Sequence, residues 1–285
     1  MTVLIVLLMF CSVSAVPDPP DYYSPEAVLL FADHLFRQQD YLRAAYEYQR
    51  YGSLQTENDP AAREVLLRAG KAFQCAGQYD RSLELFDALL KTVENNRTRE
   101  LAIYETGLTY FRMARYEQSL LFFQNQPLES LTPQSGLLCG ADLMMLGRWR
   151  QAEEAFDIYE VPDTEPLRRV AREGSTMRRK SPLAAALLSS VVPGSGKIYA
   201  GEYGDGIHSL IFVGLIGTLS VLSFRADGVD SIRGWIYASV GGVMHAGNVY
   251  GSIVSARRYN RLREEALFQE VREGIQPCSE YFLEP

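Results

Sequence analysis

One amino-acid pattern occurs four times between residues 32 and 156, and this repetition limits the possible folds more than any other feature. Each copy has a small residue, a large residue three positions later, a tripeptide that ends in an aromatic residue, and then a small residue followed four positions later by an aromatic one. The copies are Ala32, Leu35, Gln39-Asp40-Tyr41, Ala44 and Tyr48; Gly70, Phe73, Gly77-Gln78-Tyr79, Ser82 and Phe86; Gly107, Tyr110, Ala114-Arg115-Tyr116, Ser119 and Phe123; and Gly140, Leu143, Gly147-Arg148-Trp149, Ala152 and Phe156. Equal spacing within four copies predicts one structural unit repeated along the chain.

The pattern is typical of two α-helices joined by a short turn. The small first residue allows two helices to approach closely, and the large residue three positions later lies on the same helix face. The tripeptide would form the turn, since Gly77 and Gly147 suit the left-handed conformation in which many helices end. The sequence therefore predicts an all-α protein with a stack of helical hairpins.

Over residues 27–160 this pattern resembles the tetratricopeptide repeat family, although the proline that usually closes each unit is missing or displaced. The resemblance implies a right-handed superhelix of about four units with a concave face that binds peptides or partner helices. Carried over position by position, it assigns a candidate partner groove. The groove residues are Phe36, Arg37, Lys71, Gln74, Tyr104, Phe111, Arg112, Met144 and Met145. We expect this mixture of cationic and apolar side chains to suit a partner segment with some acidic character. The alternative is that these residues only pack on neighbouring units or cover the membrane region.

Two long uncharged segments follow the repeats. Ile207–Phe224 has 18 residues and Trp235–Ala256 has 22, and neither contains a formal charge. At about 1.5 Å per residue both helices match a hydrocarbon core about 30 Å thick. We therefore expect a transmembrane region of two or three segments.

A third apolar segment, from Leu183 to Val192, ends at Pro193-Gly194-Ser195-Gly196. It is compatible with a half-helix, a re-entrant element or a kinked span. The stretch Pro193-Gly194-Ser195-Gly196-Lys197-Ile198-Tyr199-Ala200-Gly201 resembles a family of small bacterial membrane domains with the motif Pro-Gly-x-Gly-x-x-Tyr-x-Gly. The resemblance implies a membrane hairpin, with Pro193, Gly194, Gly196, Tyr199 and Gly201 as the motif residues, and says little about activity.

Small residues recur at every fourth position in the last apolar segment. Gly242 and Ala246 share one face, and Gly247 and Gly251 share another. Such spacing lets membrane helices touch closely. We expect packing within this chain, with homo-oligomers formed through the last transmembrane helix as the alternative. His245 and Asn248 lie in the middle of this segment and could form hydrogen bonds between helices.

The first 15 residues have an apolar core followed by Val13-Ser14-Ala15, which is the outline of a secretory signal peptide. An uncleaved anchor is the alternative. We expect a bacterial inner-membrane protein with its repeats on the extracytoplasmic side. Two crossings would leave both the 178–180 and the 257–263 basic clusters outside. Three crossings would place the second cluster inside, which the positive-inside rule weakly favours.

These segments give the expected domain order. Residues 1–15 are the signal peptide, 16–26 a Pro-rich linker, 27–160 the repeats, 161–180 a charged linker, 181–256 the membrane domain and 257–285 a polar tail.

The remaining composition excludes several functions. A net charge of −7 and a pI near 5.2 argue against nucleic-acid binding. No metal-ligand spacing or catalytic set is visible, and Gly194-Ser195-Gly196-Lys197 lacks residues that a phosphate loop requires. Cys75 and Cys139 are expected to be small buried hydrophobes. We therefore expect no enzyme and no cofactor, but a membrane-anchored, exported scaffold for other proteins. The alternative is a component of a membrane assembly or transport machinery whose working part is the C-terminal region.

Overall fold

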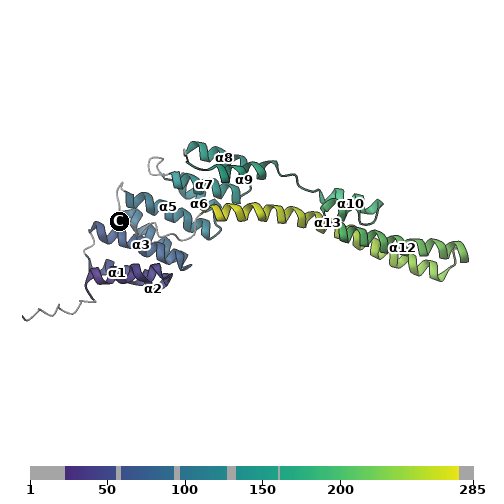
Figure 1. Ribbon diagram of the computed structural model, residues 1–285, viewed down its shortest axis with the longest axis horizontal. Coiled ribbons are helices and arrows are strands. Elements are labelled where there is room, and N and C mark those ends of the chain that lie inside the picture. The colour runs from purple at the N-terminus through teal and green to yellow at the C-terminus, as the bar shows by residue number, and fades with distance from the viewer. Residues whose placement is uncertain (1–22, 56–58, 93–96, 127–132, 160, 276–285) are drawn as a thin grey trace, which may run out of the picture. The chain divides into compact units, whose positions relative to one another are not determined.

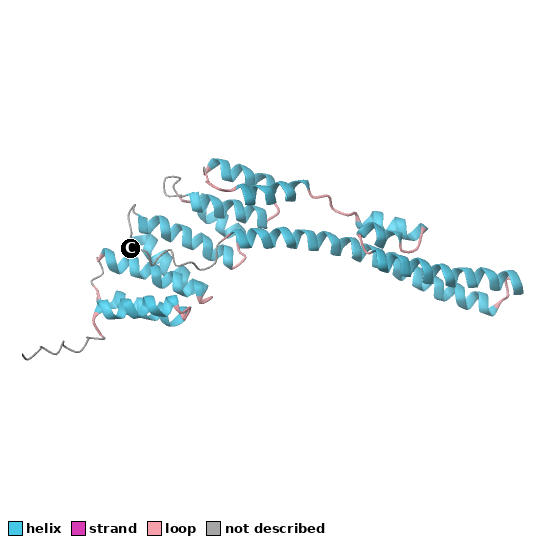
Figure 2. Cartoon of the chain, viewed as in Figure 1, coloured by secondary structure: helices cyan, strands magenta, loops and turns pink. Residues whose placement is uncertain are grey.

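The computed structural model describes residues 23–55, 59–92, 97–126, 133–159 and 161–275, and every regular element in these ranges is an α-helix (Figure 2). The predicted signal peptide and most of the predicted Pro-rich linker lie outside the described residues. In chain order the helices are α1 (Pro25–Arg37), α2 (Tyr41–Leu54), α3 (Pro60–Cys75), α4 (Tyr79–Thr92), α5 (Arg97–Arg112), α6 (Tyr116–Gln124), α7 (Pro133–Met145), α8 (Trp149–Ile158), α9 (Glu165–Thr176), α10 (Pro182–Val191), α11 (Ser195–Ala200), α12 (Tyr203–Asp227) and α13 (Ile232–Gly274) (Figure 1). The prediction of an all-α fold is confirmed for this part of the chain.

The described residues form two compact units that divide between Thr109 and Tyr110, within α5. The first unit contains α1 to α4 and most of α5. The second contains α6 to α13.

The four predicted turns have the same backbone geometry. The first residue of each turn tripeptide is left-handed: φ is 62° at Gln39, 74° at Gly77, 56° at Ala114 and 71° at Gly147. In each turn the next amide donates to the carbonyl five residues earlier, as Gln78 N does to Phe73 O at 2.8 Å. These bonds satisfy carbonyls at the end of the first helix of each hairpin. The prediction that Gly77 and Gly147 end helices in this conformation is confirmed.

The small residues of the repeat stand where helices touch. A Cβ added to Gly70 would overlap the Phe86 ring, and one added to Gly140 would overlap the Phe156 ring. Both rings are fully buried. The close approach of helices that the pattern predicted is thus seen in α3–α4 of the first unit and α7–α8 of the second.

The C-terminal part of α13 packs on the last hairpins of the second unit, against α7 and α9. Leu267, Val271 and Ile275 are buried there. The Phe268 ring stacks on Trp149 with centroids 5.7 Å apart. The predicted polar tail from residue 257 therefore continues a single helix and contributes apolar side chains to the repeat core.

The N-terminal part of α13 pairs with α12 in an antiparallel hairpin. Ile216 packs at Gly241, and Ser220 Oγ donates to Gly234 O at 3.0 Å. Within the described ranges, only α12 is long and apolar enough to cross a membrane by length and composition. The second predicted span, Trp235–Ala256, lies inside the 43-residue α13 and stays a prediction.

The two cysteines in the described residues differ. Cys139 is a buried free thiol, as expected. Cys75 is disulfide-bonded, so the prediction that it is only a small buried hydrophobe was wrong.

Candidate functional site

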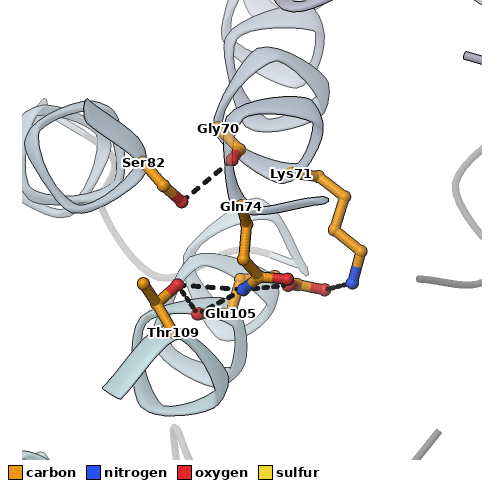
Figure 3. Close-up of polar contacts among 6 residues, drawn as sticks. All are labelled: Gly70, Lys71, Gln74, Ser82, Glu105 and Thr109. Atoms are coloured by element: carbon orange, nitrogen blue, oxygen red, sulfur yellow. Dashed lines mark hydrogen bonds and ion pairs between the residues drawn. The ribbon is translucent and has the colours of Figure 1, made fainter. Parts of the chain in front are cut away.

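The predicted groove residues Lys71 and Gln74 form a buried polar cluster between α3 and α5 (Figure 3). Lys71 Nζ donates to Glu105 Oε1 at 2.6 Å, and the two side chains are only 5% and 1% exposed. Gln74 Nε2 donates to Glu105 Oε2 at 3.1 Å and to Thr109 Oγ1 at 2.9 Å. These bonds join the first helices of two consecutive hairpins.

A similar cluster joins the first hairpin to the second. Arg68 pairs with Asp33 at 3.3 Å, and Tyr48 Oη donates to the same Asp33 carboxylate at 2.7 Å. Burial, followed by the bond to Asp33, raises the pKa of Tyr48 well above its ordinary range. Tyr48 therefore stays a neutral hydrogen-bond donor.

The charged pairs of the two clusters have almost the same separation in the sequence. Arg68 lies 35 residues after Asp33, and Glu105 lies 34 residues after Lys71. In each pair, one residue follows the small residue of its copy by one position, and the other precedes the small residue of the next copy by two positions. A comparison of these two positions in consecutive copies could have identified both pairs. The groove positions repeat within single copies, whereas these pairs join residues of two consecutive copies.

Most predicted groove residues are packed inside the protein. Phe36, Lys71 and Gln74 are buried in the first unit, and Phe111, Met144 and Met145 are buried in the second. Tyr104 and Arg112 are half-buried, and only Arg37 is exposed. In this structure the six buried side chains contribute to packing between helices, and the partner groove stays a prediction.

The fourth hairpin contains a buried acid, Asp142 of α7. The pKa of this carboxyl is raised to about 8: burial raises it most, a hydrogen bond from Ser119 opposes the rise, and the nearby charge of Glu117 adds to it. The side chain is fully buried. At neutral pH this carboxyl is therefore mostly protonated.

The predicted membrane motif lies where α10, α11 and α12 converge. A Cβ on Gly194 would overlap the Gly206 carbonyl, and one on Gly196 would overlap the Ala185 carbonyl. Gly194 and Gly201 also have left-handed backbones, with φ of 85° and 97°. Glycine is thus required at these motif positions by close backbone contact or by conformation.

Polar contacts join the segment before α10 to α11 and α13. The Lys180 amide donates to Asn260 Oδ1 at 2.7 Å, and Asn260 Nδ2 donates to Lys180 O at 2.9 Å. The Lys180 ammonium also lies 4.8 Å from the ring centre of Tyr199, whose hydroxyl accepts from Ser181 N at 3.1 Å. Tyr199 of the motif therefore connects α11 to the residues just before α10.

The predicted small-residue faces of α13 have different environments. Gly251 is in contact with the Lys197 side chain, 3.2 Å from the position of an added Cβ. Gly242 and Gly247 have open space at that position, and Ala246 is exposed. Among the described residues, packing within the chain therefore involves Gly251 and does not involve the face of Gly242 and Ala246. His245 Nε2 lies 3.2 Å from Ser190 O, so the predicted interhelical contact is present there.

In the ranges that the structure describes, no group of three or more His, Cys, Asp or Glu side chains is arranged to hold a metal ion. The described residues thus contain buried polar clusters between consecutive hairpins, and a bundle of α10 to α13 with exposed apolar side chains. A scan against protein-family models finds no match for this chain, and a search of curated proteins finds no significant relative.

Proposed function

We propose that this protein is a membrane-anchored scaffold in which α13 connects a stack of helical hairpins to a membrane hairpin. The single helix α13 packs on α7 and α9 through its C-terminal part and on α10 and α12 through its N-terminal part. At about 1.5 Å per residue it is roughly 65 Å long. Movement of the membrane hairpin would therefore be transmitted to the last repeats.

The membrane position is supported by large apolar side chains that are exposed in the described part of the chain. They include Leu183, Leu187 and Val191 of α10; Ile207, Ile211, Phe212, Leu215 and Leu222 of α12; and Trp235, Ile236, Val240 and Val243 of α13. Soluble monomers rarely expose large apolar patches, and here the exposed apolar residues are concentrated on α10, α12 and α13. The α12 helix is about 37 Å long, enough for a hydrocarbon core of about 30 Å.

The contacts of α10 and α11 favour two crossings and a re-entrant segment. Lys180, two residues before α10, is hydrogen-bonded to Asn260, and the carbonyl of Ser190 near the end of α10 contacts His245. These positions on α13 are about 22 Å apart, less than the hydrocarbon thickness. Glu202, which follows α11, accepts a hydrogen bond from Ser255 Oγ of α13 at 2.5 Å. Both basic clusters would then lie on the same side.

The leader and the Cys75 disulfide favour the extracytoplasmic side for the repeats, because disulfides persist in oxidising compartments. The positive-inside rule opposes this, since the basic clusters would be outside with them. Labelling of a single cysteine introduced at exposed Glu84, in intact cells and with a membrane-impermeant maleimide, decides between the sides. A cytoplasmic location predicts labelling only after the cells are lysed.

An alkaline wash of membranes tests the anchor. We expect the full chain to stay in the membrane pellet and to dissolve only with detergent. Replacing the exposed residues Leu215, Leu219 and Leu222 with Gln should release it, since these side chains are uncovered in the structure. Release of the unchanged chain by the wash would contradict the proposal.

The scaffold role requires a partner surface, and the face of α7 and α9 is already occupied by α13. The exposed face of α1 is the proposed surface in the first unit, with Leu30, Phe31 and Arg37. A photo-crosslinking residue at position 31, with one at exposed Glu84 of α4 as the control, tests it. A protein that crosslinks at 31 and is lost in Arg37→Glu supports the surface. Equal crosslinking at both positions contradicts it.

A further inference from the structure

A cavity of about 300 Å³ lies between α11, α12 and α13, near the end of the bundle that contains the glycine motif. The polar residues that line it are Lys197, Asp205, His208, Ser209 and Asn248. The structure thus brings a cation, a carboxylate and an amide together next to the proposed lipid surface.

Asn248 is the buried member of this group. It is only 5% exposed, and neither its amide oxygen nor its amide nitrogen has a hydrogen-bond partner within the described residues. An amide buried without partners is unfavourable, because the bonds that it made to water are not replaced. Its position at the cavity indicates that a ligand supplies the missing partner.

Lys197 and Asp205 provide charges that are not paired with each other. Lys197 Nζ donates to Ser209 Oγ at 3.0 Å. Across the part of the chain that the structure describes, neither Lys197 nor Asp205 is within 4.0 Å of an oppositely charged side chain. A cation near lipid requires an anionic partner or access to water.

The cavity becomes apolar in one direction. Phe212 lies about two turns beyond Asp205 on α12, and Met244 lies one turn before Asn248 on the antiparallel α13. Both positions lie further toward the loop that joins the two helices. Gly247 adds no side chain, and the space at its Cβ position is open.

We propose that this cavity binds the headgroup of a zwitterionic aminophospholipid. The phosphodiester would lie between the Lys197 ammonium and the Asn248 amide, and the lipid ammonium would lie near Asp205. The first part of an acyl chain would follow Phe212 and Met244. This inference rests on the proposed membrane position of α12.

The test uses the full-length protein, purified in detergent, freed of lipid and examined by native mass spectrometry. Three probes are added: phosphatidylethanolamine, diacylglycerol with the same chains, and glycerophosphoethanolamine. We expect phosphatidylethanolamine to be retained at least tenfold more than the other two. Equal retention of diacylglycerol would show only an acyl groove, and equal retention of glycerophosphoethanolamine would show a soluble-anion site. Either result overturns the proposal.

Three variants examine the site separately. Lys197→Gln, Asn248→Leu and Gly247→Leu should each lower retention of phosphatidylethanolamine at least fivefold. Arg225→Gln removes the same charge at the other, exposed end of α12 and should leave retention unchanged. Asn248→Leu should not lower the melting temperature without lipid, because it removes an amide that has no partner. Retention equal to wild type in all three variants overturns the site.

Failure of this proposal can be told from failure of the membrane anchor. If the anchor is wrong, the unchanged chain is released by the alkaline wash. If only the lipid site is wrong, the chain stays in the membrane pellet and binds lipids without selectivity for the phosphate.

Discussion

At the scale of single residues, four turns with one backbone geometry are built from different amino acids. Gly77 and Gly147 adopt a left-handed backbone without steric cost, whereas Gln39 and Ala114 adopt it with a side chain. A side chain in this region costs about 1 kcal/mol. The hydrogen bonds of the turn and the packing of the hairpin offset this cost.

The substitution Ala114→Gly should therefore stabilise the protein by about 0.5–1 kcal/mol, which corresponds to a rise in Tm of roughly 2 °C. Thermal unfolding of the full chain in detergent measures it. The control is Ala88→Gly at an exposed position inside α4, which should lower stability by about 1 kcal/mol. A loss of stability in both variants would contradict the argument.

Asp142 gives a pH dependence with a definite sign. Its pKa is raised from 3.8 to about 8 in the folded protein. Between these two pH values the carboxyl is protonated in the native state and ionised in the unfolded chain. Its contribution to stability is fully present below about pH 4 and is lost as pH rises through about 8. Asp142→Asn should thus raise Tm at pH 8, by an amount equivalent to about 1–3 kcal/mol, and have little effect at pH 4. Melting curves at both pH values check this, and a larger gain at pH 4 would contradict it.

At the scale of helices, the charged side chains of consecutive hairpins serve as joints. Lys71 of α3 and Glu105 of α5 are almost fully buried, whereas the pair of Lys91 and Asp87 within α4 is exposed. Removing one member of a buried pair leaves the other charge uncompensated.

Lys71→Met should therefore cost about 3–5 kcal/mol, whereas Lys91→Met should cost less than about 0.5 kcal/mol. The double variant Lys71→Met with Glu105→Gln should recover much of the loss, because it removes the unpaired charge. Thermal unfolding of the three variants in the same detergent provides the measurement. Similar small losses for both single Lys variants would show that the buried joint contributes little.

The packing of α10 on α11 depends on a glycine with no room for a side chain. Gly196→Ala would overlap the Ala185 carbonyl, whereas Gly217→Ala places its methyl group in open space on α12. We expect Gly196→Ala to lower Tm by several degrees, since packing strain of this kind costs about 1–3 kcal/mol. Gly217→Ala should leave Tm unchanged or slightly raised. Equal melting temperatures would show that the motif is not closely packed.

At the scale of the whole molecule, the continuity of α13 is the feature with most consequence for function. Leu262 is exposed in the stretch between its two packed parts, so a substitution there disturbs the helix with little effect on either core. Leu262→Pro should break the helix at a cost of about 3 kcal/mol or more. Limited proteolysis in detergent should then cut near residue 262, and Leu262→Ser should remain resistant. Resistance in both variants would contradict a role for α13 as the connection.

The sequence alone was sufficient to predict the all-α fold, the hairpin turns and the close contacts at Gly70 and Gly140. These follow from local conformation and from spacing within each copy, which are properties of neighbouring residues. For the glycine motif the sequence indicated only a membrane hairpin, and the close backbone contacts of Gly194 and Gly196 became known from the tertiary structure.

The tertiary structure decided which side chains are free and which are occupied. Lys71 and Gln74 fit a groove by position, but Glu105 in the next hairpin pairs with them. The tail after residue 257 reads as polar, but it packs Leu267 and Val271 into the repeats. Such pairings join residues distant in sequence, and they depend on which surfaces the folded chain brings together.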